Sequence, residues 1–133
     1  MTIVYRGVDL KDIMPKLREV LEGHGDVVIA VVFGSAIRRR LVRDLDIAVY
    51  FEGRPSLKRI LRLAAELEEV VNIPVDLTPL NLAPPGLVFK VLATGKPILV
   101  RDRVLLASLL HRALGEHMDI GIKLRMAWSR GRN

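Results

Sequence analysis

The amino-acid sequence predicts an α/β protein (of the α+β kind) in which a small mixed β-sheet packs against helices, with a further helix at the C-terminal end. Short apolar runs rich in β-branched residues alternate along the chain with longer segments of helical periodicity. The 133 residues are half apolar, and no long linker divides them. We therefore expect one domain over residues 1–133, with a core at about 9–102 and a C-terminal helical segment at about 103–128.

The first helix and the first strand follow from the spacing of apolar residues. These residues recur at helical spacing over about Asp12–Glu22. Pro15 is compatible with this helix only in its first turn, where a missing N–H costs nothing. The continuous apolar run Val27–Phe33 (VVIAVVF) is typical of a strand buried on both faces, and Gly34-Ser35 end it.

A strand, a helix and a short strand are predicted next. Leu45–Phe51 (LDIAVYF) has the apolar character of a second buried strand, although it carries an aspartate. Leu57–Val71 has helical periodicity, and Ser56 is placed to cap this helix. Ile73–Leu77 predicts a third strand, and Pro74 indicates that it lies at a sheet edge or that the strand starts there.

The last part of the chain is predicted to hold helices and one strand. Pro84-Pro85 open a helix over Gly86–Ala93, and Lys96–Val100 predicts a short strand. A long apolar helix begins at about Arg103, after Asp102 as its N-cap, and two glycines can divide it, Gly115 and Gly121. Its apolar surface is wider than a small domain can cover, which predicts contact with another chain. That surface consists of Val104, Leu105, Leu106, Leu109, Leu110, Ala113, Leu114 and Met118.

Composition limits the classes of function. The net charge is +6, with 21 Lys and Arg against 15 Asp and Glu, and such a balance attracts polyanions. Aromatic residues are only 5% of the chain, which argues against a platform that stacks single-stranded bases. The apolar stretches are shorter than the roughly 20 residues that span a bilayer, and no segment resembles a signal peptide. We expect a cytoplasmic protein with no membrane partner.

Cysteine and histidine chemistry is not expected. The chain has no cysteine, so it forms neither a disulfide nor a metal thiolate. His24 lies between glycines and is expected to be exposed, while His111 and His117 are too far apart to share a metal on one helical face. The absence of cysteine and glutamine and the scarcity of asparagine also suggest a thermophilic source.

Three aspartates form the strongest candidate site. Asp44 and Asp46 are two residues apart at the second predicted strand, so their side chains point to the same face. Two such carboxylates repel each other, and a hard cation such as Mg²⁺ would stabilise them. Asp76 lies in the third predicted strand and can join them. Three carboxylates can hold two metal ions, an arrangement that supports phosphoryl-type transfer.

A second candidate site follows the first predicted strand. Gly34-Ser35 end this buried strand before a possible helical turn, where backbone N–H groups and a helix dipole favour phosphate. Glycine lets a phosphate approach the backbone, and the serine hydroxyl adds a hydrogen bond. Four arginines follow, and guanidinium groups suit phosphate oxygens: Arg38, Arg39, Arg40 and Arg43. A solvated basic loop is the competing interpretation of the arginines.

These residues carry a family resemblance. The run VVFGSAIRRRLVRDLDIAVYFEG (Val31–Gly53) resembles the nucleotidyltransferase domain of the DNA polymerase β superfamily. That domain has a strand, Gly-Ser, Asp-x-Asp in the next strand and a third carboxylate in a later one. The small size and the segment Val75–Asp102 resemble the minimal nucleotidyltransferases, the antitoxins of HEPN/MNT toxin–antitoxin pairs.

The resemblance implies a fold, an activity and a role for each site residue. The fold would be the nucleotidyltransferase fold. Gly34, Ser35 and Arg38 would bind the triphosphate of ATP or another NTP. Asp44, Asp46 and Asp76 would be catalytic and would ligate Mg²⁺, two ions when nucleotide is bound. The enzyme would be a protein adenylyltransferase that transfers AMP from ATP to a hydroxyl, on a tyrosine of a HEPN toxin.

Two other functions stay open on the sequence alone. The protein could neutralise a partner by contact, with a catalytically inactive site. It could also be a small basic nucleic-acid-binding protein, although the low aromatic content and the lack of a recognition motif weigh against this. The apolar surface of the C-terminal helix predicts a homodimer or a contact with the HEPN partner.

Overall fold

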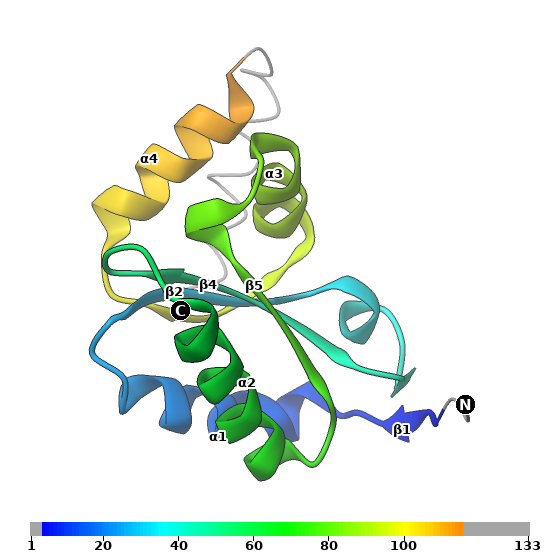
Figure 1. Ribbon diagram of the computed structural model, residues 1–133. Coiled ribbons are helices and arrows are strands. Elements are labelled where there is room, and N and C mark those ends of the chain that lie inside the picture. The colour runs from blue at the N-terminus through cyan, green and yellow to red at the C-terminus, as the bar shows by residue number, and fades with distance from the viewer. Residues whose placement is uncertain (1–3, 116–133) are drawn as a thin grey trace.

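The computed structural model describes residues 4–115, in which a β-sheet lies between two pairs of helices (Figure 1). Helices α1 and α2 cover one face of the sheet, and α3 and α4 cover the other. The elements in chain order are β1 (Arg6–Gly7), α1 (Leu10–Glu22), β2 (Val27–Phe33), the 3-10 turn η1 (Gly34–Ile37), β3 (Leu41–Val42), β4 (Leu45–Phe51), α2 (Leu57–Val71), β5 (Val75–Pro79), the 3-10 turn η2 (Leu80–Leu82), α3 (Pro85–Thr94), β6 (Lys96–Val100) and α4 (Arg103–Leu114). The predicted class of fold, a mixed sheet packed against helices, is confirmed.

The main sheet has four strands in the order β5-β4-β2-β6. Strand β2 is antiparallel to both of its neighbours, and β4 runs parallel to β5. Of the two central strands, β2 is entirely apolar and β4 is apolar except for Asp46, as expected for strands that are covered on both faces. Strand β5 is an edge strand directly after Pro74, which agrees with the expectation drawn from that proline.

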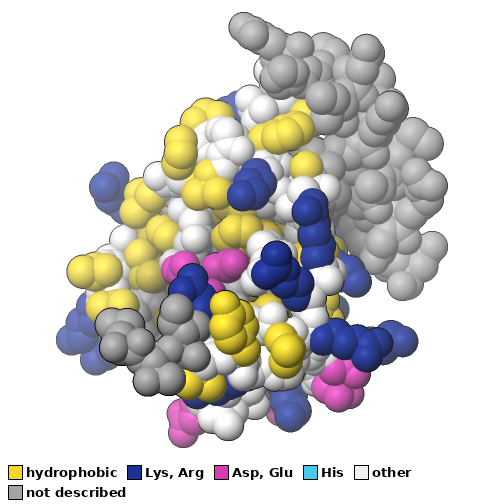
Figure 2. Space-filling view, turned by 90° about the vertical axis from the view of Figure 1, so that its right-hand side faces the viewer, with side chains coloured by type: hydrophobic (Ala, Val, Ile, Leu, Met, Phe, Trp, Pro, Cys, Tyr) yellow, Lys and Arg dark blue, Asp and Glu magenta, His cyan; other side chains and the backbone are white. Residues whose placement is uncertain are grey.

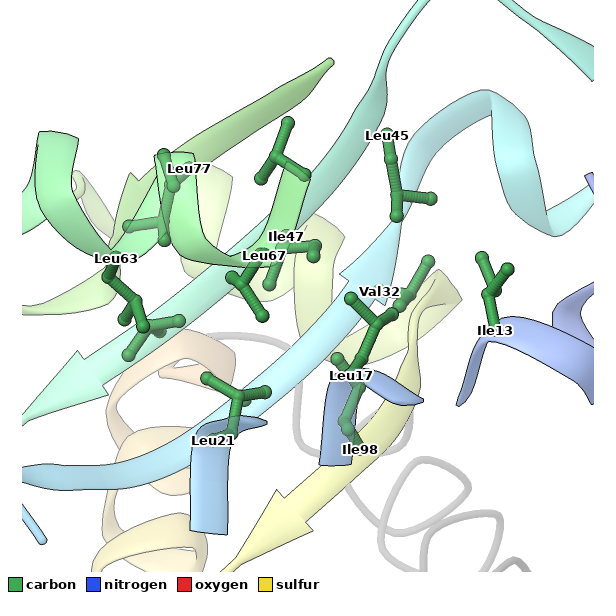
Figure 3. Packing of buried hydrophobic residues seen from close by; sticks show 14 of the residues in the cluster. Ile13, Leu17, Leu21, Val32, Leu45, Ile47, Leu63, Leu67, Leu77 and Ile98 are labelled. Carbon is green, nitrogen blue, oxygen red and sulfur yellow. The ribbon is translucent and has the colours of Figure 1, made fainter. Parts of the chain in front are cut away.

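Two hydrophobic clusters hold the helices to the sheet. On one face, Leu17 and Leu21 of α1 and Leu63 and Leu67 of α2 are completely buried against the strands (Figure 3). On the other face, side chains of α3 and α4 pack on alternate residues of β2 and β4: Ile29, Val31, Phe33, Ala48, Val88, Val91, Leu92, Leu106, Leu109, Leu110 and Leu114. Burial of apolar side chains at this scale is the main stabilising contribution to the fold.

Helix α1 begins two residues earlier than the sequence predicts. Asp9 is its N-cap, and the Asp9 carboxylate accepts a hydrogen bond from the backbone N–H of Lys11 at 3.0 Å. Pro15 therefore lies in the second turn of α1, so the expectation that it would have to lie in the first turn was wrong. The helix continues because Leu17 and Leu21 bury its apolar face, which outweighs the one backbone hydrogen bond that proline cannot donate.

Two further differences concern strands. Strand β5 covers Val75–Pro79, two residues later than predicted, and the carbonyl of Pro74, directly before it, accepts from the Leu45 N–H at 2.8 Å. The antiparallel pair β1–β3 was not predicted, since strands of two residues carry too little periodicity to be detected.

Helix α4 agrees with its predicted start. The Asp102 carboxylate accepts from the Leu105 N–H at 2.9 Å, as an N-cap does. Gly115 follows the last residue of the helix, whereas Gly121, Met118 and the rest of the predicted C-terminal segment lie outside the described residues. Most of the apolar surface expected to be left over is covered by this domain itself, since Leu106, Leu109, Leu110 and Leu114 are buried, whereas Val104 is 80% exposed. No helix of residues 4–115 is long and apolar enough to cross a bilayer.

A polar network closes the sheet at the end where β2 begins. Arg59 of α2 donates two hydrogen bonds to the Asp26 carboxylate, at 2.6 and 2.8 Å, and lies over the Phe51 ring. His24 contacts Arg59 through Nδ1 at 3.0 Å and Glu66 through Nε2 at 2.8 Å. The expectation that His24 is simply exposed was wrong, because its partners come from a helix more than 30 positions away in the sequence.

Candidate active site

The three aspartates and the Gly34 turn meet at one end of the main sheet. Strand β2 terminates at this end, while β4 and β5 begin there. Asp46 lies opposite Phe33 in the β2–β4 ladder and opposite Asp76 in the β4–β5 ladder. Asp46 shares the face of Ala48, which packs under α3, because side chains alternate along a strand. The parallel register places Asp76 on the same face.

Gly34 brings the backbone of η1 against the Asp46 carboxylate. Its φ of +78° is a left-handed conformation that favours glycine. A Cβ atom at this position would overlap Asp46 Oδ2 and would lie 3.1 Å from Asp46 Cγ. The Ser35 carbonyl then accepts from the N–H groups of Arg38 and Arg39, at 3.1 and 2.8 Å, which closes the turn. The predicted helical turn after β2 is therefore present, and its first residue, Gly34, lies against Asp46 of β4.

The three aspartates act on one another electrostatically. The pKa of Asp46 is raised from its ordinary value of 3.8 to about 6. Burial is the largest cause of this shift, and the nearby charges of Asp44 and Asp76 contribute the rest of the increase. Lys90 of α3 opposes the shift and lowers the Asp46 pKa. Asp44 and Asp46 are partly buried, and Asp76 is exposed. Figure 2 shows acidic side chains gathered on the face at this end of the molecule, with Lys and Arg side chains around them.

The donor chemistry of this cluster fits a hard divalent cation. Carboxylate oxygens are the ligands that Mg²⁺ prefers, and a cation would offset the repulsion that raises the Asp46 pKa. Among residues 4–115, no three carboxylate or histidine side chains already form a set that could hold an ion by themselves. Because Mg²⁺ is usually bound by one or two carboxylates together with water and substrate phosphates, a partial protein set still fits it.

The structure separates Arg38 from the aspartates. The charges that act on Asp46 are those of Asp44, Asp76 and Lys90. Arg38 is exposed and lines a groove on the α1 side of η1, whereas the aspartates lie on the α3 side. The sequence did not predict that Lys90 belongs to the site, because only the packing of α3 on the sheet brings its charge near Asp46.

Family comparison is consistent with this arrangement. Residues 15–104 match the family described as polymerase beta nucleotidyltransferase. The chain belongs to this family. The matched range contains Gly34, Ser35 and all three aspartates, and it runs from α1 to the start of α4. The protein is accordingly a nucleotidyltransferase, as the resemblance of its motifs implied.

Relatives and solved structures extend this result. A Methanocaldococcus jannaschii protein, provisionally named a protein adenylyltransferase, is 36% identical over 87 residues, which are 64% of this chain and 92% of the relative. A chain from the complex of the tri-AMPylated Shewanella oneidensis HEPN toxin with the MNT antitoxin has a TM-score of 0.68 at 18% identity, over 92% of this chain and 98% of that one. A toxin–antitoxin structure with AMP-PNP gives 0.68 at 19% identity, over 88% and 96%. At such low identities, these structures show that the nucleotidyltransferase has the same fold.

Proposed function

We propose that this nucleotidyltransferase is a Mg²⁺-dependent protein adenylyltransferase that moves AMP from ATP to a hydroxyl group, with pyrophosphate as the leaving group and loss of the hydroxyl proton. The observation that carries the proposal is the position of Asp46. It is partly buried, close to Asp44 and Asp76 and in contact with the Gly34 turn, and its pKa is raised first by burial and then by the charges of those two carboxylates. A site with this electrostatic character is suited to a cation and a triphosphate together.

Each residue has a role in this proposal. Asp44, Asp46 and Asp76 would hold up to two Mg²⁺ ions, which would offset the charge of the phosphates in the transferring and leaving groups. Gly34 and Ser35 would bind the triphosphate, because the glycine leaves room for a phosphate beside the backbone. Asp76, the most exposed of the three, is the best placed to receive the proton of the acceptor hydroxyl.

The acceptor in this proposal is a tyrosine of a HEPN toxin, and the protein is the antitoxin of that pair. The support is the adenylyltransferase name of the Methanocaldococcus jannaschii relative and the AMPylated toxin in the Shewanella oneidensis complex. Transfer of AMP to a toxin residue would neutralise the toxin in a covalent way.

Label transfer from ATP tests the enzymatic proposal. Purified protein is incubated with Mg²⁺, a HEPN-type toxin as the acceptor and ATP labelled at the α-phosphate. Label on the partner is expected with the wild type and is expected to be lost with Asp44→Asn and Asp46→Asn. Asp12→Asn is the matched control, because Asp12 is an exposed aspartate on α1. A folded wild-type protein that transfers no label to the partner contradicts the proposal.

The same variants separate catalysis from neutralisation by contact. If the antitoxin works by transfer, Asp46→Asn no longer protects cells from the toxin. If Asp46→Asn protects as well as the wild type, the protein neutralises the toxin by binding it, and the adenylyl transfer is not what protects the cell.

The partner contact is proposed to use α4. Val104 is 80% exposed on this helix, a large apolar side chain that would be shielded by another chain. Either the HEPN partner or a second copy of this chain can cover it. Sedimentation of the isolated protein at micromolar concentration decides between them, since a monomer there contradicts the homodimer.

A further inference from the structure

A basic groove lies beside the candidate active site, on the α1 side of η1. Its volume is about 490 Å³. Five cationic side chains and one carboxylate line it: Lys11, Arg38, Arg39, Arg40, Lys96 and Asp9. The remaining lining residues are apolar: Val8 before α1, Leu10 at the start of α1, and Ala36 and Ile37 of η1. The groove thus combines a strong positive charge with an apolar floor.

The backbone holds the arginine loop in place at this groove. The Val8 N–H donates to the Arg40 carbonyl at 2.6 Å, and the Arg39 N–H donates to the Ser35 carbonyl at 2.8 Å. The short β1–β3 pair anchors the chain directly after the loop. A loop fixed on both sides in this way presents its guanidinium groups from a defined position.

The cations of the groove have no acidic ion-pair partner in the described part of the chain. Within residues 4–115, the ion pairs involve other side chains, and none includes the lysines or arginines of the groove. The Asp9 carboxylate caps α1 through the Lys11 N–H. Five positive charges around one negative charge repel one another, so an anionic ligand would be favoured there.

The groove is separate from the acidic centre but shares a wall with it. Gly34, at the start of η1, touches Asp46 on the α3 side, while Ala36 and Ile37 of the same turn line the groove. The charges that act on Asp46 do not include those of the groove. A ligand in the groove would therefore lie next to a nucleotide held at the aspartates, without occupying its place.

The lining favours a peptide over a nucleic acid. Among residues 4–115, no aromatic side chain lines the groove, so this part of the chain offers unpaired bases no surface on which to stack. Apolar side chains and cations together suit a polypeptide in which carboxylates alternate with apolar residues. We propose that this groove binds an acidic segment of the acceptor protein and so presents the acceptor hydroxyl to the active site, an inference that rests on the proposed function.

Peptide binding to the full-length protein tests the inference. The probe is a short fluorescent peptide in which one tyrosine is flanked by alternating glutamate and leucine, and its neutral counterpart carries glutamine in place of glutamate. Fluorescence anisotropy, in buffer without ATP, is expected to show binding of the acidic peptide at least about tenfold tighter than that of the neutral one, with affinity falling as salt rises.

A matched pair of double variants locates the binding. Arg39→Glu with Arg40→Glu is expected to weaken binding of the acidic peptide by about tenfold or more. Arg54→Glu with Arg62→Glu makes the same change in net charge at exposed positions outside the groove, and it is expected to change the affinity by less than about twofold.

Four results overturn the inference. The first is equal binding of the acidic and neutral peptides, and the second is an equal loss in the two double variants, which indicates attraction to net charge alone. The third is an oligouridylate that binds more tightly than the acidic peptide and depends more strongly on Arg39 and Arg40, which assigns the groove to RNA. The fourth is displacement of the peptide by MgATP, with ATP affinity lost in the Arg39→Glu, Arg40→Glu protein, which makes the groove part of the nucleotide site.

The peptide-binding assay tests the groove, and the AMP-transfer assay tests the proposed function, so a failure of one can be told from a failure of the other. In one case the peptide binds at the groove but the wild type transfers no AMP. This result contradicts the proposed function and the role of the groove in binding the acceptor, while it still supports a binding site for acidic peptides. AMP transfer without groove-dependent binding contradicts only the inference. If both hold, Arg39→Glu with Arg40→Glu raises the KM for the acidic peptide and leaves kcat unchanged.

Discussion

Asp46→Asn should make the metal-free protein more stable at neutral pH although it removes activity. In the folded protein the Asp46 carboxylate is partly buried and faces two other carboxylates, and these surroundings raise its pKa to about 6. An asparagine has nearly the same shape and no charge. It therefore relieves both the cost of burying a charge and the repulsion from Asp44 and Asp76.

The size of this effect follows from the pKa. A rise from 3.8 to about 6 is a shift of about two units, and each unit corresponds to about 1.4 kcal/mol. The upper bound on the gain in unfolding free energy is thus about 3 kcal/mol. Solvent reaches part of the side chain and screens the repulsion, so the expected gain is on the order of 1 kcal/mol.

The pH dependence gives the sign of the effect. Between pH 3.8 and about 6, the folded wild type binds more protons at Asp46 than the unfolded chain does. This contribution to stability is present at low pH and is lost as pH rises to about 6. The advantage of Asp46→Asn over the wild type should therefore be near zero below pH 3.8, grow over this interval and stay constant above it.

Urea unfolding in EDTA at several pH values measures this difference, with Asp12→Asn as the control for loss of an exposed charge. Addition of Mg²⁺ with a non-hydrolysable ATP analogue should then stabilise the wild type and not Asp46→Asn. A variant that is no more stable than the wild type at neutral pH, or an advantage that is the same at every pH, would refute this reasoning.

Three further substitutions test the packing around the site and at the opposite end of the sheet. Gly34→Ala should cost roughly 1–2 kcal/mol of unfolding free energy, because the φ of Gly34 is +78°. The variant should also lose ATP binding, because the new Cβ would overlap the Asp46 carboxylate. Calorimetry with an ATP analogue measures this binding, and an unchanged affinity would contradict the prediction. Gly95→Ala should cost about 1–3 kcal/mol in urea unfolding, since its Cβ would lie 2.6 Å and 2.9 Å from two backbone carbonyl oxygens, whereas Gly25→Ala, with open space around it, should change stability by less than about 0.5 kcal/mol. Asp26→Asn should cost about 1 kcal/mol at neutral pH, because the paired arginine lowers the Asp26 pKa; the loss should disappear as pH falls below 3.8, and a loss that persists in acid would point to packing instead.

Local patterns were sufficient to predict most of the elements. The runs VVIAVVF and LDIAVYF are apolar enough to be strands buried on both faces wherever they sit, and β2 and β4 have the predicted limits. Capping by Ser56 and Asp102 was also predicted, because an N-cap depends only on the next few residues. The start of α1 was missed because Pro15 suggested a later first turn, while tertiary burial of Leu17 and Leu21 outweighed this local preference.

The candidate site was predictable in part for the same reason. The two-residue repeat of a strand predicted that the side chains of Asp44 and Asp46 share a face, but β4 begins at Leu45 and Asp44 lies in the bend directly before it, so this repeat does not by itself place Asp44. The adjacency of Asp46 and Asp76 depends on the parallel pairing of β4 with β5, which are separated by α2. The sequence could suggest that pairing but could not fix its register.

The sequence by itself determined which residue types are available: Gly34-Ser35 after a buried strand, and carboxylates at Asp44, Asp46 and Asp76. The tertiary structure alone decided that Gly34 touches Asp46, that Lys90 opposes its charge, and that the arginines after η1 line a groove on the other face. These contacts join segments far apart in the chain. They are set by the combined packing of helices on both faces of the sheet, which no local pattern of residues contains.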